Sequence, residues 1–370
     1  KAEMSKLKKI LRTSLNRLQP YNTGLSISEI QAKYSINEIA KLGSNENPYG
    51  PSVAVLEGLS SYKSDIHLYP ESNATWLRKK MSNYLQVPPE HLIFGNGSEE
   101  LLSIICRSVI EKGDRVITLY PSFPLHEDYV EMMGGEVEKI VVNGDLEIDV
   151  PTLIEAVRKP AKMLIFANPM NPVGASLNPS QLRDVIDAKH PDTLLVLDEA
   201  YFEYALEGDY CSGLDLLNNN TGNWVILRTF SKAWGLAGLR IGFGVCSSTE
   251  LRSALDLTRT PFNVNSMAQS AAVLALQNDP YMKRHVSIII QERSIVRSFL
   301  CKMGYKSAPS LGNFLFFDVK RPSTEFSEKL LSKGTIVKPW KQPRFETFLR
   351  VSIGTPKENK KFMNDFNKSL

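Results

Sequence analysis

The chain reads HLIFGNGSEELLSIICRSVIEKGDRVITL from His91 to Leu119. The apolar run His91 to Phe94 is typical of a buried strand, and Leu101 to Val109 has the apolar spacing of a helix. A strand, a helix and a second strand in succession predict a parallel sheet. The Gly-rich turn between them predicts a helix that begins at about Glu99. Its free backbone N–H groups and positive dipole end can bind an anion.

The same alternation continues from about Asn73 to Asp256, without a long low-complexity linker or an internal repeat. Beyond His91 to Phe94, the runs typical of strands are Arg115 to Leu119, Lys162 to Phe166, Leu194 to Leu197, Trp224 to Leu227 and Ile241 to Val245. We therefore expect an α/β fold with a mainly parallel, doubly wound sheet. After Pro261 the pattern changes to a long helical stretch, Ser266 to Lys302, and then to short strands around Phe314 to Val319 and Leu349 to Ile353.

Length and composition indicate a cytoplasmic enzyme. The chain has 370 residues and is 42% hydrophobic, which is enough for two domains. Its four cysteines are widely spaced, without the C-x-x-C or His pairing of a metal site, so neither a metal nor a disulfide framework is expected. The net charge of +4 is too small for an extended nucleic-acid surface. Neither a membrane span nor a signal peptide is expected.

The strongest chemical signal is Lys232, in Thr229-Phe230-Ser231-Lys232-Ala233-Trp234-Gly235, which is followed by Arg240 in a Gly-rich turn. A lysine amine can form a Schiff base with a carbonyl cofactor, and hydroxyls with a fixed guanidinium can hold that cofactor's phosphate. The segment therefore points to pyridoxal phosphate. Thr229, Ser231 and Arg240 would form the phosphate site together with the backbone of Ser98 and Glu99. A Ser-Lys pair alone is also common on ordinary surfaces.

Two further segments supply the remaining cofactor contacts. Asp198 ends the strand Leu194 to Leu197, where it could pair with a protonated pyridine nitrogen, and Tyr201 follows it. Asn171 lies in a Pro- and Gly-punctuated loop after another strand, so Asn171 and Tyr201 could both donate to the ring's phenolate oxygen. An N-cap role for Asp198, and simple turn formation by the Asn-Pro pairs, are the alternative interpretations. The occurrence of all these segments in one order favours the cofactor site.

From Pro20 almost to its end, the chain resembles the fold-type I pyridoxal-phosphate aminotransferases, and within them the histidinol-phosphate aminotransferase group. The segments that carry the likeness are Pro20-Tyr21, Lys41 to Pro51, Tyr69-Pro70, Gly95 to Glu100, the Asn-Pro, Asp198-x-x-Tyr201 and Ser-Lys segments, and Leu349 to Thr355. The resemblance implies an aspartate-aminotransferase-like fold. In it, residues 46–262 form a large cofactor domain, and residues 1–45 with 263–370 form a smaller, discontinuous α+β domain.

The resemblance also implies roles for single residues. Phe123 falls where the family stacks a ring on the pyridine, although a core phenylalanine is the alternative. His126 falls where some relatives have a histidine that orients the aspartate. Tyr69 is implied to reach the cofactor phosphate of the neighbouring subunit, which makes the enzyme a homodimer with shared active sites. Lys232 is implied to bind the cofactor and to carry the substrate's proton.

Substrate recognition is implied by a second set of residues. Arg350 matches an arginine that binds a substrate carboxylate or phosphate, Tyr21 matches a tyrosine that contacts the substrate phosphate, and Asn47 and Asn313 match positions near the substrate. Lys338 departs from the family, which commonly has a second arginine before that strand, and Trp340 adds a large apolar surface nearby.

These residues imply transamination of histidinol phosphate with 2-oxoglutarate, in histidine biosynthesis. An aromatic or broad-specificity aminotransferase and a threonine-phosphate-type decarboxylase stay open as alternatives. A pyridoxal-phosphate-binding transcription regulator would need a DNA-binding domain, for which the segment before Pro20 is too short, since independent domains need about 50 residues or more.

The first residues predict an amphipathic helix. Leu7, Ile10, Leu11, Leu15 and Leu18 recur at helical spacing within a basic stretch. We expect this helix to pack on the body of the protein or on a partner subunit, rather than on a membrane or a nucleic acid.

Overall fold

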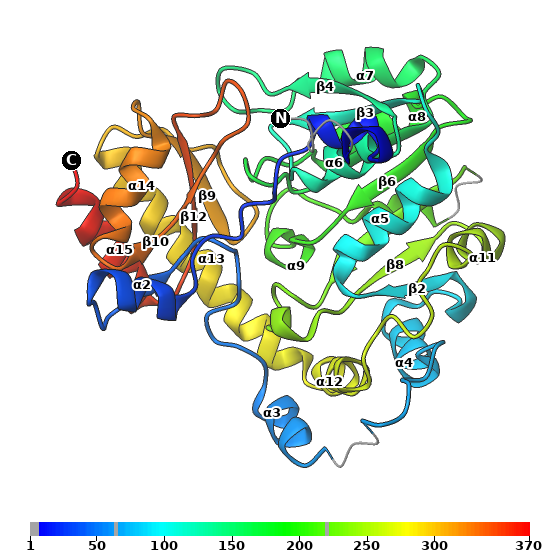
Figure 1. The fold of residues 1–370 in the computed structure, drawn as a ribbon, viewed down its shortest axis with the longest axis horizontal. Helices are drawn as coiled ribbons and strands as arrows, with labels where there is room; N and C mark the ends of the chain where they lie inside the picture. Colours follow the sequence, from blue (N-terminus) through cyan, green and yellow to red (C-terminus); the bar gives the residue numbers. More distant parts are fainter. Residues whose placement is uncertain (1–6, 63–65, 219–221) are drawn as a thin grey trace.

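A seven-stranded sheet forms the centre of the larger part of the molecule (Figure 1). The computed structural model describes residues 7–62, 66–218 and 222–370. The order across the sheet is β2 (Leu92–Gly95), β8 (Gly242–Cys246), β7 (Trp224–Thr229), β6 (Leu194–Asp198), β5 (Met163–Ala167), β3 (Arg115–Tyr120) and β4 (Glu136–Val141). β8 runs antiparallel to both of its neighbours, and the other neighbouring pairs are parallel. The predicted mainly parallel α/β sheet is therefore confirmed.

Helices cover both faces of this sheet because its strands are apolar on both sides. In β6, Leu194 and Val196 pack in one core cluster, whereas Leu195 and Leu197 pack in another. The first cluster includes side chains of α5 (Gly97–Val109), α6 (Leu125–Met132) and α11 (Thr249–Asp256). The second includes side chains of α7 (Val150–Arg158) and α8 (Pro179–Ala188). The sheet is therefore doubly wound.

A smaller unit lies beside the large sheet (Figure 1). Its antiparallel sheet has the order β11 (Lys338–Pro339), β12 (Phe348–Ser352) and β9 (Phe314–Asp318), and β1 (Ala40–Lys41) pairs in parallel with β10 (Thr335–Ile336). Its helices are α2 (Ile27–Tyr34), α14 (Ser323–Leu331) and α15 (Pro356–Asn367), and α13 (Asp279–Lys302) contacts both units. The exact domain boundaries, 46–262 against 1–45 with 263–370, stay a prediction.

The remaining elements connect these layers. They are the short 3-10 helices η1 (Thr13–Arg17), η2 (Pro89–His91) and η3 (Ala237–Leu239), and the helices α3 (Val53–Ser60), α4 (Thr75–Leu85), α9 (Phe202–Ala205), α10 (Gly213–Leu217) and α12 (Ser266–Gln277). The long helical stretch expected from Ser266 to Lys302 is two helices, α12 and α13, divided at Asn278. At Asn278 the backbone leaves the helical region, with φ −119° and ψ 34°, and a proline follows in the first turn of α13.

The edge strand β4 and the N-terminal helix differ from the sequence prediction, as do the two-residue strands β1, β10 and β11, which were not predicted. β4 was not predicted, because only Ile140 is buried in its glutamate-rich sequence at the sheet edge. The prediction of a continuous N-terminal amphipathic helix is wrong for the described residues. A helical turn covers residues 7–10, and the backbone is extended at Arg12 before η1 begins. Ile10 is 80% exposed, so it does not pack on the body of this chain.

No helix among the residues described is both long and apolar enough to cross a membrane.

A buried ion pair joins the centre of the large sheet to α10. Glu199, which is fully buried directly after β6, lies 3.1 Å from the guanidinium of Arg228 on β7. Its carboxylate also accepts hydrogen bonds from Ser212 Oγ and from the backbone N–H of Gly213, each at 2.7 Å. These neighbours of the carboxylate are all donors, and the ion pair therefore fixes the chain just beyond Asp198.

Removal of this carboxylate should destabilise the fold. We expect Glu199→Ala to lower the free energy of unfolding by about 3–5 kcal/mol, because Arg228 is left as an uncompensated buried charge. Urea unfolding followed by circular dichroism measures the change. The matched control is Glu155→Ala, which removes an exposed ion pair with Lys159 and should cost less than about 1 kcal/mol. Equal effects of the two variants would contradict the role given to Glu199.

Candidate active site

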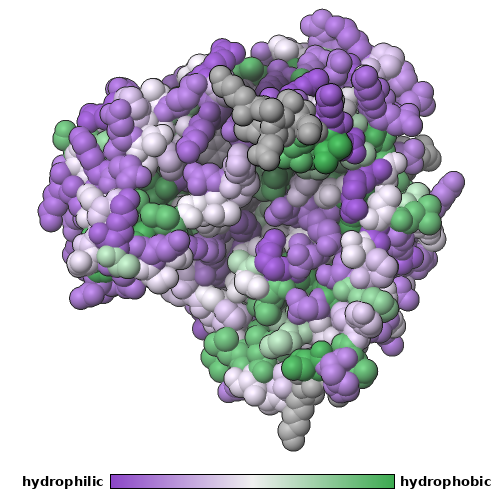
Figure 2. Space-filling model, in the orientation of Figure 1, coloured by the Kyte–Doolittle hydropathy of each residue, from purple (hydrophilic) through white to green (hydrophobic). Residues whose placement is uncertain are grey.

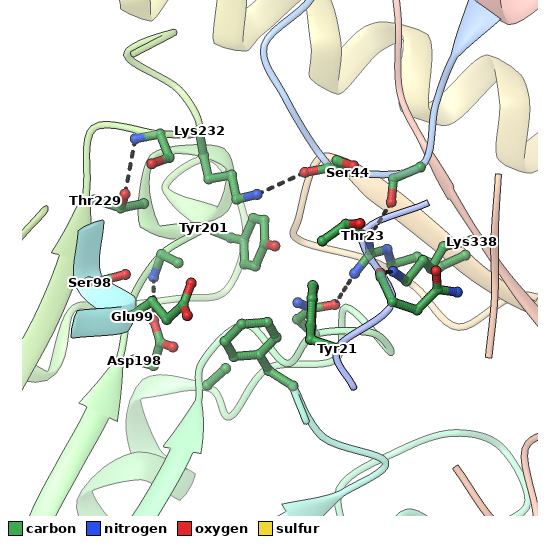
Figure 3. Close-up of a pocket in the computed structure, with 18 of the residues that line it drawn as sticks. Tyr21, Thr23, Ser44, Ser98, Glu99, Asp198, Tyr201, Thr229, Lys232 and Lys338 are labelled. Atoms are coloured by element: carbon green, nitrogen blue, oxygen red, sulfur yellow. Dashed lines mark hydrogen bonds between the residues drawn. The ribbon is translucent and has the colours of Figure 1, made fainter. Parts of the chain in front are cut away.

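A cavity of about 190 Å³ opens at the carboxyl ends of the parallel strands, next to the smaller unit. Open α/β sheets place their ligands at this edge. Three strands end in residues that line it: Ala167 on β5, Asp198 on β6 and Thr229 on β7. The predicted site residues that line it are Tyr21, Ser98, Glu99, Phe123, Asn171, Asp198, Tyr201, Thr229, Ser231, Lys232, Arg240, Lys338 and Arg350. Segments far apart in the sequence thus form one site (Figure 3).

One end of the cavity is built to bind an anion. Ser98 and Glu99 lie in the first turn of α5, where no side chain caps the free backbone N–H groups. Arg240 Nη1 donates to Ser231 Oγ at 3.3 Å, and the Thr229 hydroxyl accepts from the Ser231 N–H at 2.9 Å. Hydroxyls, helix N–H groups and a guanidinium together suit a phosphate.

Two glycines keep this end open. A Cβ at Gly97 would lie 2.5 Å from Arg240 Nη2, and Gly97 has a φ of +77°. A Cβ at Gly242 would lie 2.3 Å from the backbone nitrogen of Ser98. Any larger side chain at either position would therefore displace the groups that face the anion.

Asp198 is held in one orientation at the floor of the cavity. Its Oδ2 lies 2.8 Å from His126 Nε2, and its Oδ1 accepts from the backbone N–H of Ala200 at 3.1 Å. Both Asp198 and His126 are buried. His126 therefore lies behind the aspartate as the resemblance implied, and the carboxylate cannot rotate freely.

Lys232 reaches across the cavity towards the smaller unit (Figure 3). Its Nζ donates to the backbone oxygen of Ser44 at 2.9 Å. Burial and, next in size, the positive charge of Arg350 lower the pKa of the Lys232 amine to about 7. A large share of the amine is therefore uncharged near neutral pH, and an uncharged amine is the nucleophilic form.

Tyr201 is fixed by a residue that the sequence analysis did not single out. Asn45 Nδ2 donates to the Tyr201 hydroxyl at 2.9 Å, and Asn45 Oδ1 accepts from Ser352 Oγ at 2.7 Å. Burial raises the pKa of Tyr201 to about 12, so its hydroxyl keeps its proton. The signal for Asn45 was its place in the Lys41 to Pro51 segment, where its backbone adopts a φ of 56° that asparagine tolerates well.

The opposite end of the cavity carries a second set of cationic groups. Arg350 donates from Nη1 to Asn171 Oδ1 and from Nη2 to the backbone oxygen of Gly43, both at 2.7 Å. Lys338 lies 5.0 Å from the centre of the Tyr21 ring and donates to the backbone oxygen of Asn22. Burial, followed by the charge of Arg350, lowers the pKa of Lys338 to about 8. This end therefore offers a fixed guanidinium beside a weaker cation.

The Tyr21 ring bridges the two sides of the cavity. It packs edge-on against Phe123 with 6.1 Å between the ring centres, and burial raises the pKa of its hydroxyl. Asn22 and Thr23, which follow Tyr21, also line the cavity, although the sequence analysis did not select them. The N-terminal segment therefore forms part of the wall.

Four of the residues expected near the substrate or cofactor lie outside the cavity lining. Asn47 donates to the backbone oxygen of Ala233, and Asn313 donates to that of Asn45, so both support the lining from behind. Trp340 is buried 5.7 Å from the Arg350 guanidinium carbon. Tyr69 is 80% exposed and stacks on Phe262 at 4.6 Å, away from this chain's own cavity.

Comparison with known proteins gives the family. The family model "Aminotransferase class I and II" matches residues 37–366, which is most of the chain. The chain belongs to the class I and II aminotransferase family. A curated relative at 50% identity is histidinol-phosphate aminotransferase 1 of Mesorhizobium japonicum, with 97% of this chain and 98% of the relative covered. Another, at 48% identity, is histidinol-phosphate aminotransferase 3 of Rhizobium meliloti, with 96% of each chain covered.

A solved structure shares the fold over nearly the whole length of this aminotransferase. It is histidinol-phosphate aminotransferase from Sinorhizobium meliloti in complex with pyridoxal 5'-phosphate, with a TM-score of 0.87, 26% identity and 97% of each chain covered. The aspartate-aminotransferase-like fold is thereby confirmed. The cavity described above fits such a cofactor, because it offers a phosphate site, a fixed carboxylate and a lysine amine in one enclosure.

The lowered pKa of Lys232 predicts an unusual labelling profile for this aminotransferase. The uncharged amine increases as the pH rises through about 7, rather than through the usual lysine value. In protein prepared without a carbonyl ligand, reductive methylation of Lys232 should therefore reach its half-maximal rate near pH 7. Peptide mass spectrometry measures it.

The control is Arg350→Met. Because the Arg350 charge is the second-largest cause of the lowered pKa, its removal should move the Lys232 profile to higher pH. A wild-type profile centred near the ordinary lysine value of about 10.4 would contradict the effect of burial.

Proposed function

We propose that this aminotransferase uses pyridoxal 5'-phosphate to transfer the amino group of histidinol phosphate to 2-oxoglutarate, which yields imidazole acetol phosphate and glutamate. The observation that carries the proposal is a cavity with an anion site at each end and a lysine amine between them. The two curated relatives at 50% and 48% identity, both histidinol-phosphate aminotransferases, support the choice of substrate. The expected pathway is histidine biosynthesis, and the expected location is the cytoplasm.

The first anion site would hold the cofactor phosphate. Ser98, Glu99, Thr229, Ser231 and Arg240 supply its donors. Asp198 would face the pyridine nitrogen and hold its proton, with His126 keeping the carboxylate in place. Asn171 and Tyr201 would donate to the phenolate oxygen, since the raised pKa keeps the tyrosine proton in place. Phe123 would stack against the ring.

Lys232 performs the proton transfer. Bound pyridoxal phosphate supplies a carbonyl carbon that captures amines and a cationic ring that withdraws electrons from the substrate Cα–H bond. Lys232 would hold the cofactor through its amine and, once released by the substrate, the free amine would remove the proton from the substrate Cα. The pKa of about 7 suits the amine to act as a nucleophile and as a base, because a large share of it is unprotonated near neutral pH. The two substrates would react one after the other at the same amine, as a ping-pong mechanism requires.

The second anion site would select the substrate. Arg350 is fixed by Asn171 and Gly43, so its guanidinium presents a rigid face to a carboxylate or a phosphate. Tyr21 and Lys338 border the same space. Two cations and a hydroxyl favour a dianionic phosphate over a neutral side chain. Histidinol phosphate and 2-oxoglutarate both bring an anionic group to this end.

The aromatic aminotransferase alternative loses its main argument. It depended on Trp340 as an apolar surface for an aromatic substrate. Trp340 instead packs below Arg350, and its Nε1 donates to Gln342 at 2.9 Å. A threonine-phosphate-type decarboxylase would use the same phosphate site. The geometry therefore does not distinguish it from an aminotransferase, but the reaction product does.

The active form proposed is a homodimer with shared active sites. Exposed apolar side chains gather over α3, α4 and α12, at the lower end of Figure 2. They include Val53, Leu56 and Trp76, which are 51–63% exposed. Such a patch marks a protein interface. Tyr69, directed away from its own cavity, would reach the cofactor phosphate of the partner.

Substrate conversion tests the function. Protein loaded with pyridoxal phosphate is mixed separately with histidinol phosphate, phenylalanine and threonine phosphate, and pyridoxamine phosphate formation is followed by absorbance. We expect fast conversion with histidinol phosphate. Lys232→Ala should keep the native circular dichroism spectrum but lose multiple turnover, because the amine that would remove the Cα proton is missing. Preference for phenylalanine, or release of carbon dioxide from threonine phosphate, would contradict the proposal.

Hybrid dimers test the shared site. Tyr69→Ala should weaken phosphate binding in the partner's site, and Lys232→Ala should inactivate its own site. In a hybrid of the two variants, one site combines an intact Lys232 with an intact Tyr69, and the other carries both changes. Mixing the two variants under conditions of subunit exchange should therefore yield more activity than either alone. Activity equal to the average of the separate variants would contradict sharing.

A further inference from the structure

Gln342 connects the two sheets beside the active site. It lies between β11 and β12 of the smaller unit, and its side chain meets the loop that follows β3 of the large sheet. Its Oε1 accepts from Trp340 Nε1 at 2.9 Å and from the backbone N–H of Ser122 at 3.0 Å. Its Nε2 donates to Ser122 Oγ and to Glu127 Oε2, each at 3.2 Å. All four positions of the amide are thus in use.

The two ends of this connection reach opposite sides of the cavity. Ser122 directly precedes Phe123, which lines the cavity on the side of the large sheet. Trp340 packs 5.7 Å from the guanidinium carbon of Arg350, which lines it on the side of the smaller unit. The amide of Gln342 therefore connects the residue before Phe123 with the tryptophan that packs against Arg350.

The surroundings of Gln342 make its donors and acceptors specific. Glu127 is buried and pairs with Lys139 at 2.7 Å, while Ser122 Oγ also donates to Glu127. A carboxylate at position 342 would place a second negative charge against Glu127 and could no longer donate to it. The amide nitrogen is therefore required on the side that faces Glu127, and the amide oxygen on the side that faces Trp340.

We propose that Gln342 is a positioning residue that sets the placement of Phe123 relative to Arg350, and hence of the cofactor ring relative to the substrate anion. This inference rests on the proposed function for the identity of cofactor and substrate. Gln342 acts through its neighbours, because it does not line the cavity itself. A shift of about 1 Å in a positioning group can cost about a hundredfold in rate.

A paired exchange of amide and carboxylate tests the inference. Gln342→Glu keeps the shape of the side chain but places a second carboxylate against that of Glu127. The double variant Gln342→Glu with Glu127→Gln again has one amide and one carboxylate facing each other. In the double variant, the amide introduced at position 127 can donate to the carboxylate introduced at position 342 and accept from Lys139. We expect the single variant to raise KM for histidinol phosphate, to lower kcat/KM by about tenfold or more, and to weaken pyridoxal phosphate binding to the apoprotein. The double variant should recover most of each loss.

Gln181→Ala is the control for a purely structural effect. Gln181 belongs to the capping box of α8, remote from the cavity, so its loss should lower Tm without changing KM or cofactor affinity. If Gln342→Glu lowers Tm but leaves KM, kcat and cofactor affinity at their wild-type values, Gln342 is not a positioning residue. Failure of the double variant to recover would overturn the inference equally.

Failure of the proposed function would be seen separately. Wild-type protein that binds pyridoxal phosphate but does not convert histidinol phosphate would contradict the substrate assignment alone. The Gln342 variants can still be compared in that case by two affinities. One is the affinity for pyridoxal phosphate, measured by absorbance titration, and the other is the affinity of the loaded protein for inorganic phosphate. Unchanged values of both in Gln342→Glu would then overturn the positioning role.

Discussion

Removal of water from the Lys232 amine is the constraint on which the site depends. The amine lies between a strand edge of the large sheet and a backbone oxygen of the smaller unit, and this burial is the main reason for its lowered pKa. An exposed lysine would be almost fully protonated at neutral pH and would be a poor nucleophile. The smaller unit therefore takes part in lowering the pKa of the amine, since it closes the enclosure around it and carries Arg350.

The electrostatics of the enclosure follow from the same arrangement. Arg240 and Arg350 lie at opposite ends and leave the centre to Lys232, and the positive charge of Arg350 further lowers the pKa of that lysine. When two anionic groups occupy the ends, this repulsion is relieved. Binding of two anionic groups would thus stabilise a cavity that carries a guanidinium at each end. Such a site suits two substrates that differ in shape but share an anionic end.

Much of this could be predicted from the sequence, for identifiable physical reasons. Fully buried parallel strands are continuous apolar runs, so Leu194 to Leu197 was recognisable, and the residue after such a run lies at the ligand edge. Asp198 was therefore expected at the cavity from its strand, whereas Thr229 and Lys232 were selected by the chemistry of the segment from Thr229 to Arg240, and all three line the cavity. The edge strand β4 lacked that signal, because its exposed side chains are charged.

Contacts between distant segments could not be predicted in the same way. Asn45 meets Tyr201, and Gln342 meets Ser122, only because the smaller unit folds against the large sheet. The Lys41 to Pro51 segment marked the neighbourhood of Asn45, but the local sequence does not indicate the partner of either Asn45 or Gln342. The N-terminal segment illustrates the same limit, since its apolar spacing predicted one continuous helix, whereas the backbone becomes extended at Arg12. Local pattern thus predicts the elements and the first site residues, whereas long-range packing selects the residues that hold them.

Identification of the amine that binds the cofactor tests the central claim most directly. Wild-type protein is saturated with pyridoxal phosphate, treated with borohydride to make the linkage permanent, digested and mapped by mass spectrometry. The account predicts that the added mass lies on the peptide that contains Lys232, and that it is absent from Lys232→Ala. Attachment to another lysine, or attachment that survives in Lys232→Ala at the wild-type level, would contradict the assignment of this cavity as the active site.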